Sequence, residues 1–363
     1  MLERFKVSPQ YQVRVPEASL REVVAAIFEK MGESPEKAST AADTLVSADL
    51  RGISTHGVSV TLPVYLRYYR DGTIKANSQW TVLRDAPGVA VTDGGHGLGI
   101  ITGPGAMRMA IEKARAVGTG VVTVVNSAHS GAIGHHAMIA ARENMVGVAM
   151  TSAGMYMHPT FGSVTRFGTN PIAIAAPARH EAPFLFDAAT TVIAGNKIQL
   201  ARRVGGKMAP GWVAGRDGVP VMEEVEPLEL GEHVPLPLGS TREGGSHKGY
   251  GLAMMVEVLT TLLSGVQASM FEDTRTDKHY FSAYDIAAFS DVDEFRDNMD
   301  RMLHTLMTTP PIPGHDRVVY PGLIEHEEEQ DRRANGIPLH RDVVRWFEQM
   351  SSELGVPWLA TVD

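Results

Sequence analysis

Between residues 89 and 152, short β-branched runs alternate with segments of helical length. The runs are VAVTD (89–93), GVVTVVN (120–126) and VGVAMTS (146–152), and PIAIAAP (171–177) follows them. Strands that alternate with helices are typical of an α/β layer. Because these runs are apolar on both faces, we expect a sheet that is buried on two sides.

The chain before this region has the apolar spacing of three helices, at residues 20–31, 35–49 and 62–69. Ser19, with a glutamate three positions later, fits a capping box at the start of the first. Ser34 followed by Pro35 predicts the start of the second, because proline suits the first position of a helix.

The second half of the chain has fewer clear patterns. Residues 249–265 are apolar nearly all round and predict a buried helix. Residues 271–300 show no regular pattern, and we interpret the acidic run at 325–331 as a solvated face. Residues 341–354 predict a final helix with one apolar side.

A length of 363 residues suggests about two domains. We expect residues 1–78 and 301–363 to form one helical domain together, and residues 79–300 to form an α/β domain inserted between them. The predicted fold class is therefore α/β, with the α/β domain inserted in a helical domain.

Composition excludes several classes of protein. The formal net charge of −9 disfavours a nucleic-acid-binding protein, which would carry a basic excess. No apolar run reaches the ~18–20 residues of a membrane span, and the N-terminus lacks the apolar core of a signal peptide. The chain has no cysteine, so disulfides, thiolate metal sites and a cysteine nucleophile are excluded. We expect a soluble cytoplasmic protein that binds neither nucleic acid nor membrane.

The glycine-rich stretch DGGHGLGIITGPGA (93–106) does not match a Rossmann dinucleotide fingerprint. That fingerprint is G-x-G-x-x-G at a strand-to-helix turn, with an acidic residue about 20 positions later. Here three glycines run at spacing two, and the next predicted strand ends at Asn126. An ordinary Rossmann domain is therefore not expected.

His129, His135 and His136 lie close together in NSAHSGAIGHH (126–136). Their spacing does not match the i, i+4 histidine pair with which a helix binds zinc. His129 follows a predicted strand, at an edge where α/β sheets bind ligands, and imidazole exchanges a proton near neutral pH. The alternative is a surface residue in a helix-capping loop. We expect His135 and His136, inside the predicted helix, to be structural.

Four other segments carry polar groups at turns or strand ends. His56 lies between glycines in DLRGISTHGVS (49–59), and Lys248 begins a helix in GGSHKGYG (244–251), where an anion would be favoured. Arg166 opens RFGTNP, and Asp187 ends an apolar strand in PFLFDAAT. For His56, a simple helix-connecting loop is the alternative.

In this order, the motifs RGISTHGV, NSAHSG, FGTNP, FDAAT…GNK, PLG, SHKGYGLA, YPG and GIPL resemble the type 2 malate/L-lactate dehydrogenase family. The resemblance runs from about Val23 to Pro357. The family also includes ureidoglycolate, sulfolactate and diketogulonate oxidoreductases and cyclic-imine reductases. The resemblance implies a non-Rossmann NAD(P)-binding α/β domain, a homodimer, and NAD- or NADP-dependent interconversion of small 2-oxo and 2-hydroxy acids.

The resemblance also implies roles for the residues that match these motifs. His56 and His129 are the catalytic acid/base candidates, and Asp187 would orient the catalytic group or contact the cofactor. The other predicted cofactor-binding residues are Thr169, Asn170, Ala188, Ala189, Lys248, Pro321 and Gly322. The predicted substrate-binding residues are Arg51, Ser54, Arg166 and Lys248, and no metal is expected.

Two positions depart from the family pattern and put the substrate in doubt. Many members have an arginine four residues past the first histidine that binds the substrate carboxylate, and here that position is Val60. The residue after the second histidine is often aromatic, and here it is Ser130. The alternatives to a 2-oxo acid dehydrogenase are a cyclic-imine reductase of the same family, a metal-dependent hydrolase with histidine ligands, and a non-catalytic binding protein.

Overall fold

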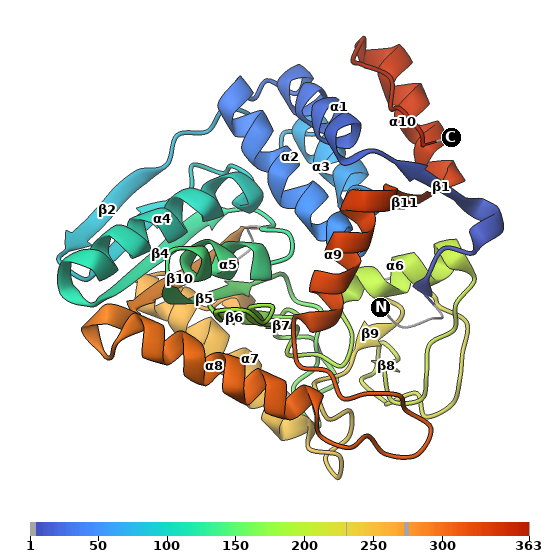
Figure 1. The fold of residues 1–363 in the computed structure, drawn as a ribbon. Coiled ribbons are helices and arrows are strands. Elements are labelled where there is room, and N and C mark those ends of the chain that lie inside the picture. The colour runs from blue at the N-terminus through green and yellow to red at the C-terminus, as the bar shows by residue number, and fades with distance from the viewer. Residues whose placement is uncertain (1–4, 230, 272–275, 363) are drawn as a thin grey trace.

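The computed structural model describes residues 5–229, 231–271 and 276–362. Figure 1 shows a central sheet, a group of helices beside it, and a smaller lobe around β8 (Val213–Ala214) and β9 (Val234–Pro235). None of the helices in the described ranges is long and apolar enough to cross a membrane.

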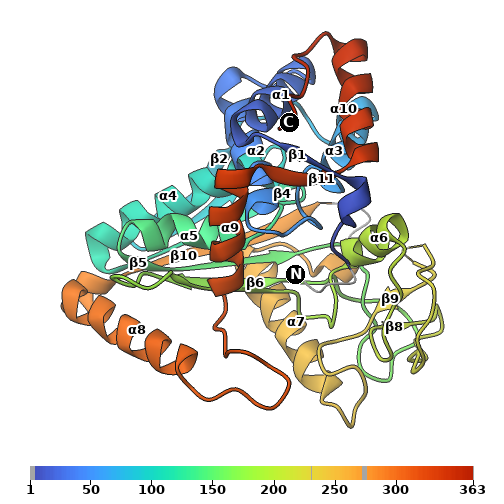
Figure 2. The same ribbon diagram turned by 45° about the vertical axis from the view of Figure 1, so that its right-hand side comes forward.

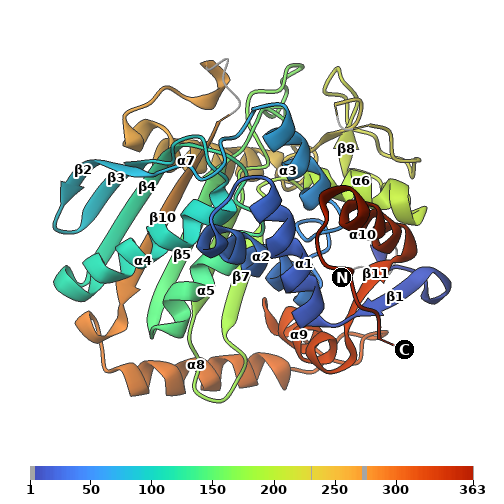
Figure 3. The ribbon, with the colours of Figure 1, turned by 90° about the horizontal axis from the view of Figure 1, so that it is seen from above.

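The central sheet has seven strands in the order β2-β3-β4-β10-β5-β6-β7 (Figure 3). Their bounds are β2 (Thr81–Ala86), β3 (Val89–Asp93), β4 (Thr119–Ser127), β5 (Met145–Ser152), β6 (Ile172–Ala176), β7 (Phe184–Ala188) and β10 (Asp277–Asp285). β3 and β4 pair in parallel, and all other neighbours are antiparallel. The α/β prediction is confirmed, and the four predicted strands coincide with β3, β4, β5 and β6.

The expectation of no regular structure at residues 271–300 is wrong. β10 runs through the middle of the sheet, and α8 (Val292–Met307) follows it. The crossover helix α5 (Gly134–Arg142) joins β4 to β5, which lie two places apart, and β10 fills the place between them in the opposite direction. Because β10 buries polar side chains such as His279 and Ser282, its sequence does not have the pattern of a core strand.

Helices cover both faces of the sheet. α4 (Gly99–Val117) and α5 pack on one face, and α7 (Ser246–Thr260) packs on the other (Figure 1). The prediction that α7 is buried all round is wrong, because one side is exposed. Four apolar residues of this side and two in the 3-10 turn that follows α7 are 37–58% exposed, and we call them the α7 strip: Leu252, Met254, Met255, Val258, Leu262 and Leu263.

The two ends of the chain pack together, as the predicted fold class requires. β1 (Gln12–Val15) pairs with β11 (Ile337–His340) in antiparallel register. One hydrophobic core joins residues of α1 (Glu17–Lys30), α2 (Pro35–Leu50), α3 (Thr61–Arg70) and α10 (Arg341–Leu354). Figure 2 shows α10 standing beside this helical group. Residues 300 and 301, the predicted domain boundary, lie within α8.

Of the two predicted helix starts, the one at Ser34 is confirmed and the one at Ser19 is wrong. Ser34 caps α2, because its hydroxyl accepts a hydrogen bond from the Lys37 N–H, and Pro35 is the first helical residue. The capping box at Ser19 is wrong, because α1 begins at Glu17. Ser19 lies in the first turn, where its hydroxyl accepts a hydrogen bond from the Ala360 N–H at 2.9 Å.

The acidic run lies in α9 (Leu323–Asn335), and the interpretation as a purely solvated face is wrong. Glu329 accepts hydrogen bonds from Arg51 at 3.1 Å and from Arg333 at 2.8 Å. Glu328 pairs with Arg332, which is 6% exposed and also donates to the Asp49 carbonyl. The run therefore attaches α9 to the N-terminal helices.

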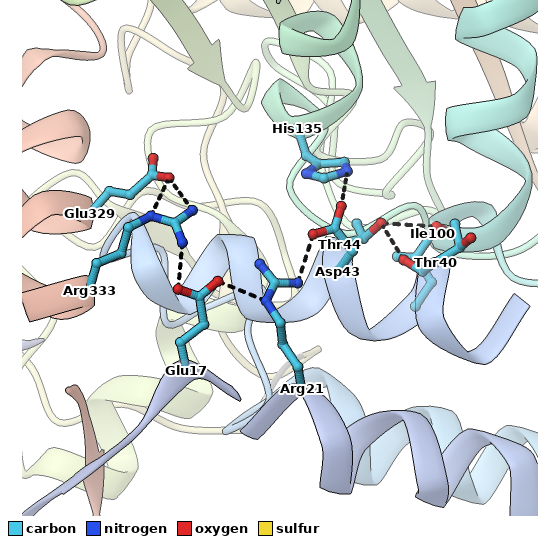
Figure 4. A network of polar contacts seen from close by, with 9 residues as sticks. All are labelled: Glu17, Arg21, Thr40, Asp43, Thr44, Ile100, His135, Glu329 and Arg333. Carbon is cyan, nitrogen blue, oxygen red and sulfur yellow. Dashed lines mark hydrogen bonds and ion pairs between the residues drawn. The ribbon is translucent and has the colours of Figure 1, made fainter. Parts of the chain in front are cut away.

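From α9, ion pairs continue through α1 to α2 (Figure 4). In order, they join Arg333, Glu17, Arg21 and Asp43. The Asp43 carboxylate also lies 3.6 Å from Nε2 of His135 on α5, a ring that burial keeps neutral by lowering its pKa. This contact agrees with a structural role.

Two histidines, His136 on α5 and His279 on β10, are fully buried, and they predict an acid-sensitive fold. Burial, reinforced by the field of His136, lowers the pKa of His279 from 6.5 to about 3. Between these values only the unfolded chain binds the proton, so stability falls as the pH falls, by about 1.4 kcal/mol per unit. We expect His279→Gln to remove this contribution. Urea unfolding at two pH values below 6.5, one unit apart, measures the difference.

The matched control is His315→Gln on an exposed loop. The pH dependence of the control should follow that of the wild type. The same pH dependence in wild type and His279→Gln would contradict this assignment.

Candidate active site

The rings of His56 and His129 stack face to face, with centroids 5.6 Å apart and planes inclined by 13°. His56 lies in the turn between α2 and α3, and His129 lies in the loop that follows β4. Both side chains are half-buried. The structure therefore brings together the two histidines that the sequence singles out.

Hydrogen bonds occupy Nδ1 of each ring. The Tyr65 hydroxyl lies 2.6 Å from Nδ1 of His129, and the Gly131 N–H donates to the same atom at 3.4 Å. The Tyr65 hydroxyl donates to Nδ1 or accepts from it according to the tautomer of the ring, and when Nδ1 carries the proton and donates to Tyr65, Nε2 has the free lone pair that a base needs. On His56, Nδ1 lies 2.9 Å from the Thr55 hydroxyl. In the described chain, Nε2 of neither ring has a hydrogen-bond partner, and these atoms are left for a ligand.

The environment keeps both rings neutral at pH 7. Burial, and to a smaller extent the fields of His129 and Lys197, lower the pKa of His56 to about 3. Burial also lowers the pKa of His129 to about 4. A neutral imidazole is a base, and an anion bound beside the rings would raise both pKa values.

Asp49 holds the loop that carries His56. Its Oδ2 accepts a hydrogen bond from the Val58 N–H at 2.7 Å. A Cβ atom on Gly57 would lie 2.0 Å from Asp49 Oδ1, so only glycine fits this position. Burial raises the pKa of Asp49 to about 7, against the lowering effects of the Val58 N–H and Arg332.

A buried polar chain supports the loop that carries His129. His136 Nε2 lies 2.9 Å from the Ser130 carbonyl, and the Ser130 hydroxyl lies 2.9 Å from that of Thr151. The Thr151 hydroxyl in turn lies 3.0 Å from Nδ1 of His279 on β10. The Ser130 hydroxyl therefore attaches the His129 loop to Thr151 on β5 and is used within the fold.

Sequence reasoning missed two residues beside the histidines. Tyr65, on α3, has the spacing of a core residue, and no sequence signal marks its hydroxyl as part of a site. Lys197 lies in the first turn of α6 (Gly195–Val204), where the neighbouring Asn196 amide donates to the Thr55 carbonyl at 2.9 Å. Lys197 is the lysine of the GNK motif, so the sequence did contain a motif that could have indicated this residue.

Asp187 lies at the end of β7 and points to the start of α5. Its Oδ2 accepts a hydrogen bond from the Gly134 N–H at 2.7 Å. Burial raises its pKa to about 6, while the Gly134 N–H and Arg51 lower it and Glu325 raises it. Its hydrogen bond is thus with the start of α5, and its predicted role toward a histidine stays a prediction.

Backbone hydrogen bonds connect the segments predicted to bind the cofactor. The Thr169 carbonyl accepts from the Thr190 N–H at 2.9 Å, just after Ala188 and Ala189. The Pro321 carbonyl accepts from the Leu185 N–H at 3.1 Å, and Gly322 follows it as the N-cap of α9. One of these segments therefore lies beside the start of β7 and the other just past its end.

The Asn170 side chain is used within the fold. Its Oδ1 accepts a hydrogen bond from the Ala153 N–H at 3.1 Å, and its Nδ2 donates to the Ala253 carbonyl at 3.0 Å. Only the backbone of Asn170 remains for a cofactor.

The other predicted ligand-binding residues lie in different surroundings. Arg166 and Lys248 are exposed, and Ser54 lines a cavity with Arg203. Val60 is 5% exposed and packed in the core. Across the described ranges, no group of three or more His, Asp or Glu side chains is placed to hold a metal ion.

Comparison with known proteins agrees with this fold. The profile of the malate/L-lactate dehydrogenase family matches residues 15–348. Malate dehydrogenase of Pyrococcus abyssi is 36% identical over 365 residues, which covers 99% of both chains. L-sulfolactate dehydrogenase of Methanocaldococcus jannaschii is 30% identical over 342 residues, covering 93% of this chain and 96% of the relative.

The fold is likewise similar to that of solved structures. Malate dehydrogenase from Entamoeba histolytica superposes with a TM-score of 0.91 at 33% identity, over 95% of this chain and 99% of the other. The sequence match and the structural match both extend over almost the whole chain. The chain therefore belongs to the malate/L-lactate dehydrogenase family and is a dehydrogenase.

Proposed function

We propose that this dehydrogenase interconverts a 2-oxo acid and a 2-hydroxy acid, with NAD or NADP as cofactor, in the cytoplasm. The observation that carries the proposal is the stacked pair of neutral histidines, His56 and His129, with both Nε2 atoms free in the described chain. Malate and sulfolactate, after which two relatives are named, are both 2-hydroxy acids.

The residues present fit a nicotinamide dinucleotide. Arg51 Nε is buried and has no hydrogen-bond acceptor in the described chain. Because a buried donor is normally hydrogen-bonded, we expect a polar atom of a ligand to accept from it. Lys248 is exposed at the start of α7, where both its charge and the helix N-terminus favour a phosphate. Backbone groups of 169–170, 188–189 and 321–322 complete this predicted set. When bound, the nicotinamide supplies or accepts the hydride.

The protein's part of the reaction is to move one proton. In oxidation, neutral His129 would take the proton of the 2-hydroxyl group as the hydride leaves the same carbon. In reduction, the imidazolium would return that proton to the oxygen that forms. Tyr65 suits both states, because its hydroxyl either donates to Nδ1 or accepts from Nδ1–H.

Tyr65→Phe is expected to lower kcat about tenfold, because it removes one hydrogen bond to a group that changes its charge. The affinity for the reduced cofactor should not change. Steady-state kinetics and cofactor fluorescence measure the two effects. Tyr11→Phe, with a partly exposed hydroxyl, is the control, and an unchanged kcat in Tyr65→Phe would remove Tyr65 from the site.

The test of function is the loss of reduced-nicotinamide absorbance with NADH or NADPH and a panel of acids. The panel contains pyruvate, oxaloacetate, sulfopyruvate, diketogulonate and a cyclic imino acid. Turnover of a 2-oxo acid supports the proposal, and turnover of the imino acid alone favours the imine reductase. Failure to bind either cofactor contradicts both.

We also propose a homodimer in which the α7 strip is covered by a second copy. A contiguous apolar surface of this kind marks an interaction site. Val258→Glu would place a charge in the strip and should shift the mass in solution from dimer to monomer, as measured by light scattering. A wild-type protein that is monomeric at micromolar concentration would contradict the dimer.

A further inference from the structure

Lys197 is a half-buried cation without an anionic partner. In the described residues no carboxylate lies within ion-pair distance of its amine, and Nζ lies over the Phe5 ring, 5.4 Å from the ring centroid. Burial lowers the pKa of Lys197. A cation removed from water is costly unless it is paired, and an aromatic face compensates only in part.

The neighbouring arginines already have partners. Arg51 pairs with Glu329 at 3.1 Å, and Arg332 pairs with Glu328 at 2.8 Å. Arg203 donates to the Ser59 carbonyl at 2.6 Å. Among the described cations near the histidines, Lys197 is thus the one whose charge is not neutralised by the protein or satisfied by a carbonyl.

The position of Lys197 is fixed relative to the reaction centre. The hydrogen bond from Asn196 to the Thr55 carbonyl, at 2.9 Å, attaches the first turn of α6 to the residue before His56. Lys197 lies close enough for its field to act on the His56 ring. An anion held by the amine would therefore lie beside the stacked rings.

We propose that Lys197 binds the carboxylate of the 2-oxo or 2-hydroxy acid. This inference rests on the proposed function, and it names the cation that Val60 does not supply. Arg166 and Lys248 are exposed, so they are less suited to a carboxylate that must lie beside the half-buried histidines. The carboxylate neutralises Lys197, and by its own charge it favours protonation of the adjacent imidazole. Substrate binding then prepares the acid that reduction needs.

The experiment is a titration of oxalate, a planar anion that resembles a 2-oxo acid, into protein loaded with NADH. The variants are Lys197→Met, which keeps the length of the side chain, and Lys197→Arg, which keeps the charge. Lys207→Met is the matched control, because Lys207 forms its ion pairs with Glu224 and Glu226 on the surface. NADH fluorescence reports cofactor and oxalate affinity separately.

We expect the Kd of oxalate to rise about 100-fold in Lys197→Met, since a hydrogen bond to a charged group is lost. The Kd of NADH should not change, Lys197→Arg should retain most of the affinity, and Lys207→Met should match the wild type. Equal oxalate affinity in Lys197→Met and wild type overturns the proposal, as does a wild type that does not bind oxalate.

If Lys197→Met does not fold, the pH dependence of oxalate affinity provides a second test. In the wild type, oxalate affinity should weaken at a pH below the ordinary lysine range, because burial lowers the pKa of Lys197, whereas Lys197→Arg should show no such loss. The same pH dependence in both proteins overturns the inference. The turnover assay is independent: a wild type that reduces a 2-oxo acid while Lys197→Met keeps its oxalate affinity retains the function and loses only this inference.

Discussion

His129→Ala is expected to lower kcat by about 10²–10⁴-fold, the usual contribution of a positioned general acid or base. The physical reason is that Nε2 of His129 is the free nitrogen of a ring whose Nδ1 is held by Tyr65 and Gly131. NADH affinity should be unchanged, because the predicted cofactor segments lie around β7. Stopped-flow absorbance and fluorescence titration measure the two quantities.

The parallel variant His56→Ala tests the other member of the pair. His304→Ala, on an exposed part of α8, is the control and should keep wild-type turnover. A histidine whose alanine variant keeps full turnover is not the proton-transfer residue. If both variants lose activity equally, the stacked pair acts as a unit.

Phe281→Ala is expected to lower the free energy of unfolding by about 3–5 kcal/mol, the range for a buried aromatic side chain. Phe281 is fully buried at the centre of β10, and its ring packs edge-on against His136, with centroids 5.4 Å apart. Truncation would open a cavity under the loop that carries His129. Urea unfolding monitored by circular dichroism measures the loss.

Phe289→Ala is the matched control, because this ring follows β10 but is 68% exposed. Its effect should stay within about 0.5 kcal/mol, as is usual for surface positions. Comparable losses in the two variants would show that β10 is not the centre of the core.

Several elements follow from local sequence alone. The run VAVTD coincides with β3, and the apolar spacing of residues 341–354 coincides with α10. Ser34 and Pro35 mark the start of α2, because capping and proline geometry involve only neighbouring residues. The capping box at Ser19 fails because α1 begins at Glu17, three residues earlier than a cap at Ser19 indicates.

The candidate site likewise has some features that local sequence indicates and others that depend on the fold. His56 and His129 stand out because each lies in a glycine-framed loop, and such loops are a local feature. The bond from Tyr65 to His129 and the lack of a carboxylate beside Lys197 depend on residues far apart in the chain. No pattern of residue spacing in the sequence indicates either of these two features.

Local sequence was enough to place the strongly patterned elements β3, β4, β5, β6, α2 and α10, to exclude an ordinary Rossmann turn, and to single out two histidines. These features depend on periodicity, capping and turn chemistry, which act over a few residues. The insertion of β10 between β4 and β5, the exposed apolar side of α7 and the stacking of the two histidine rings appear only in the folded structure. Strand pairing and side-chain contacts depend on which distant segments meet; Nδ1 of the buried His279 on β10, for example, has a hydrogen-bond partner in the core because β5 brings the Thr151 hydroxyl to it.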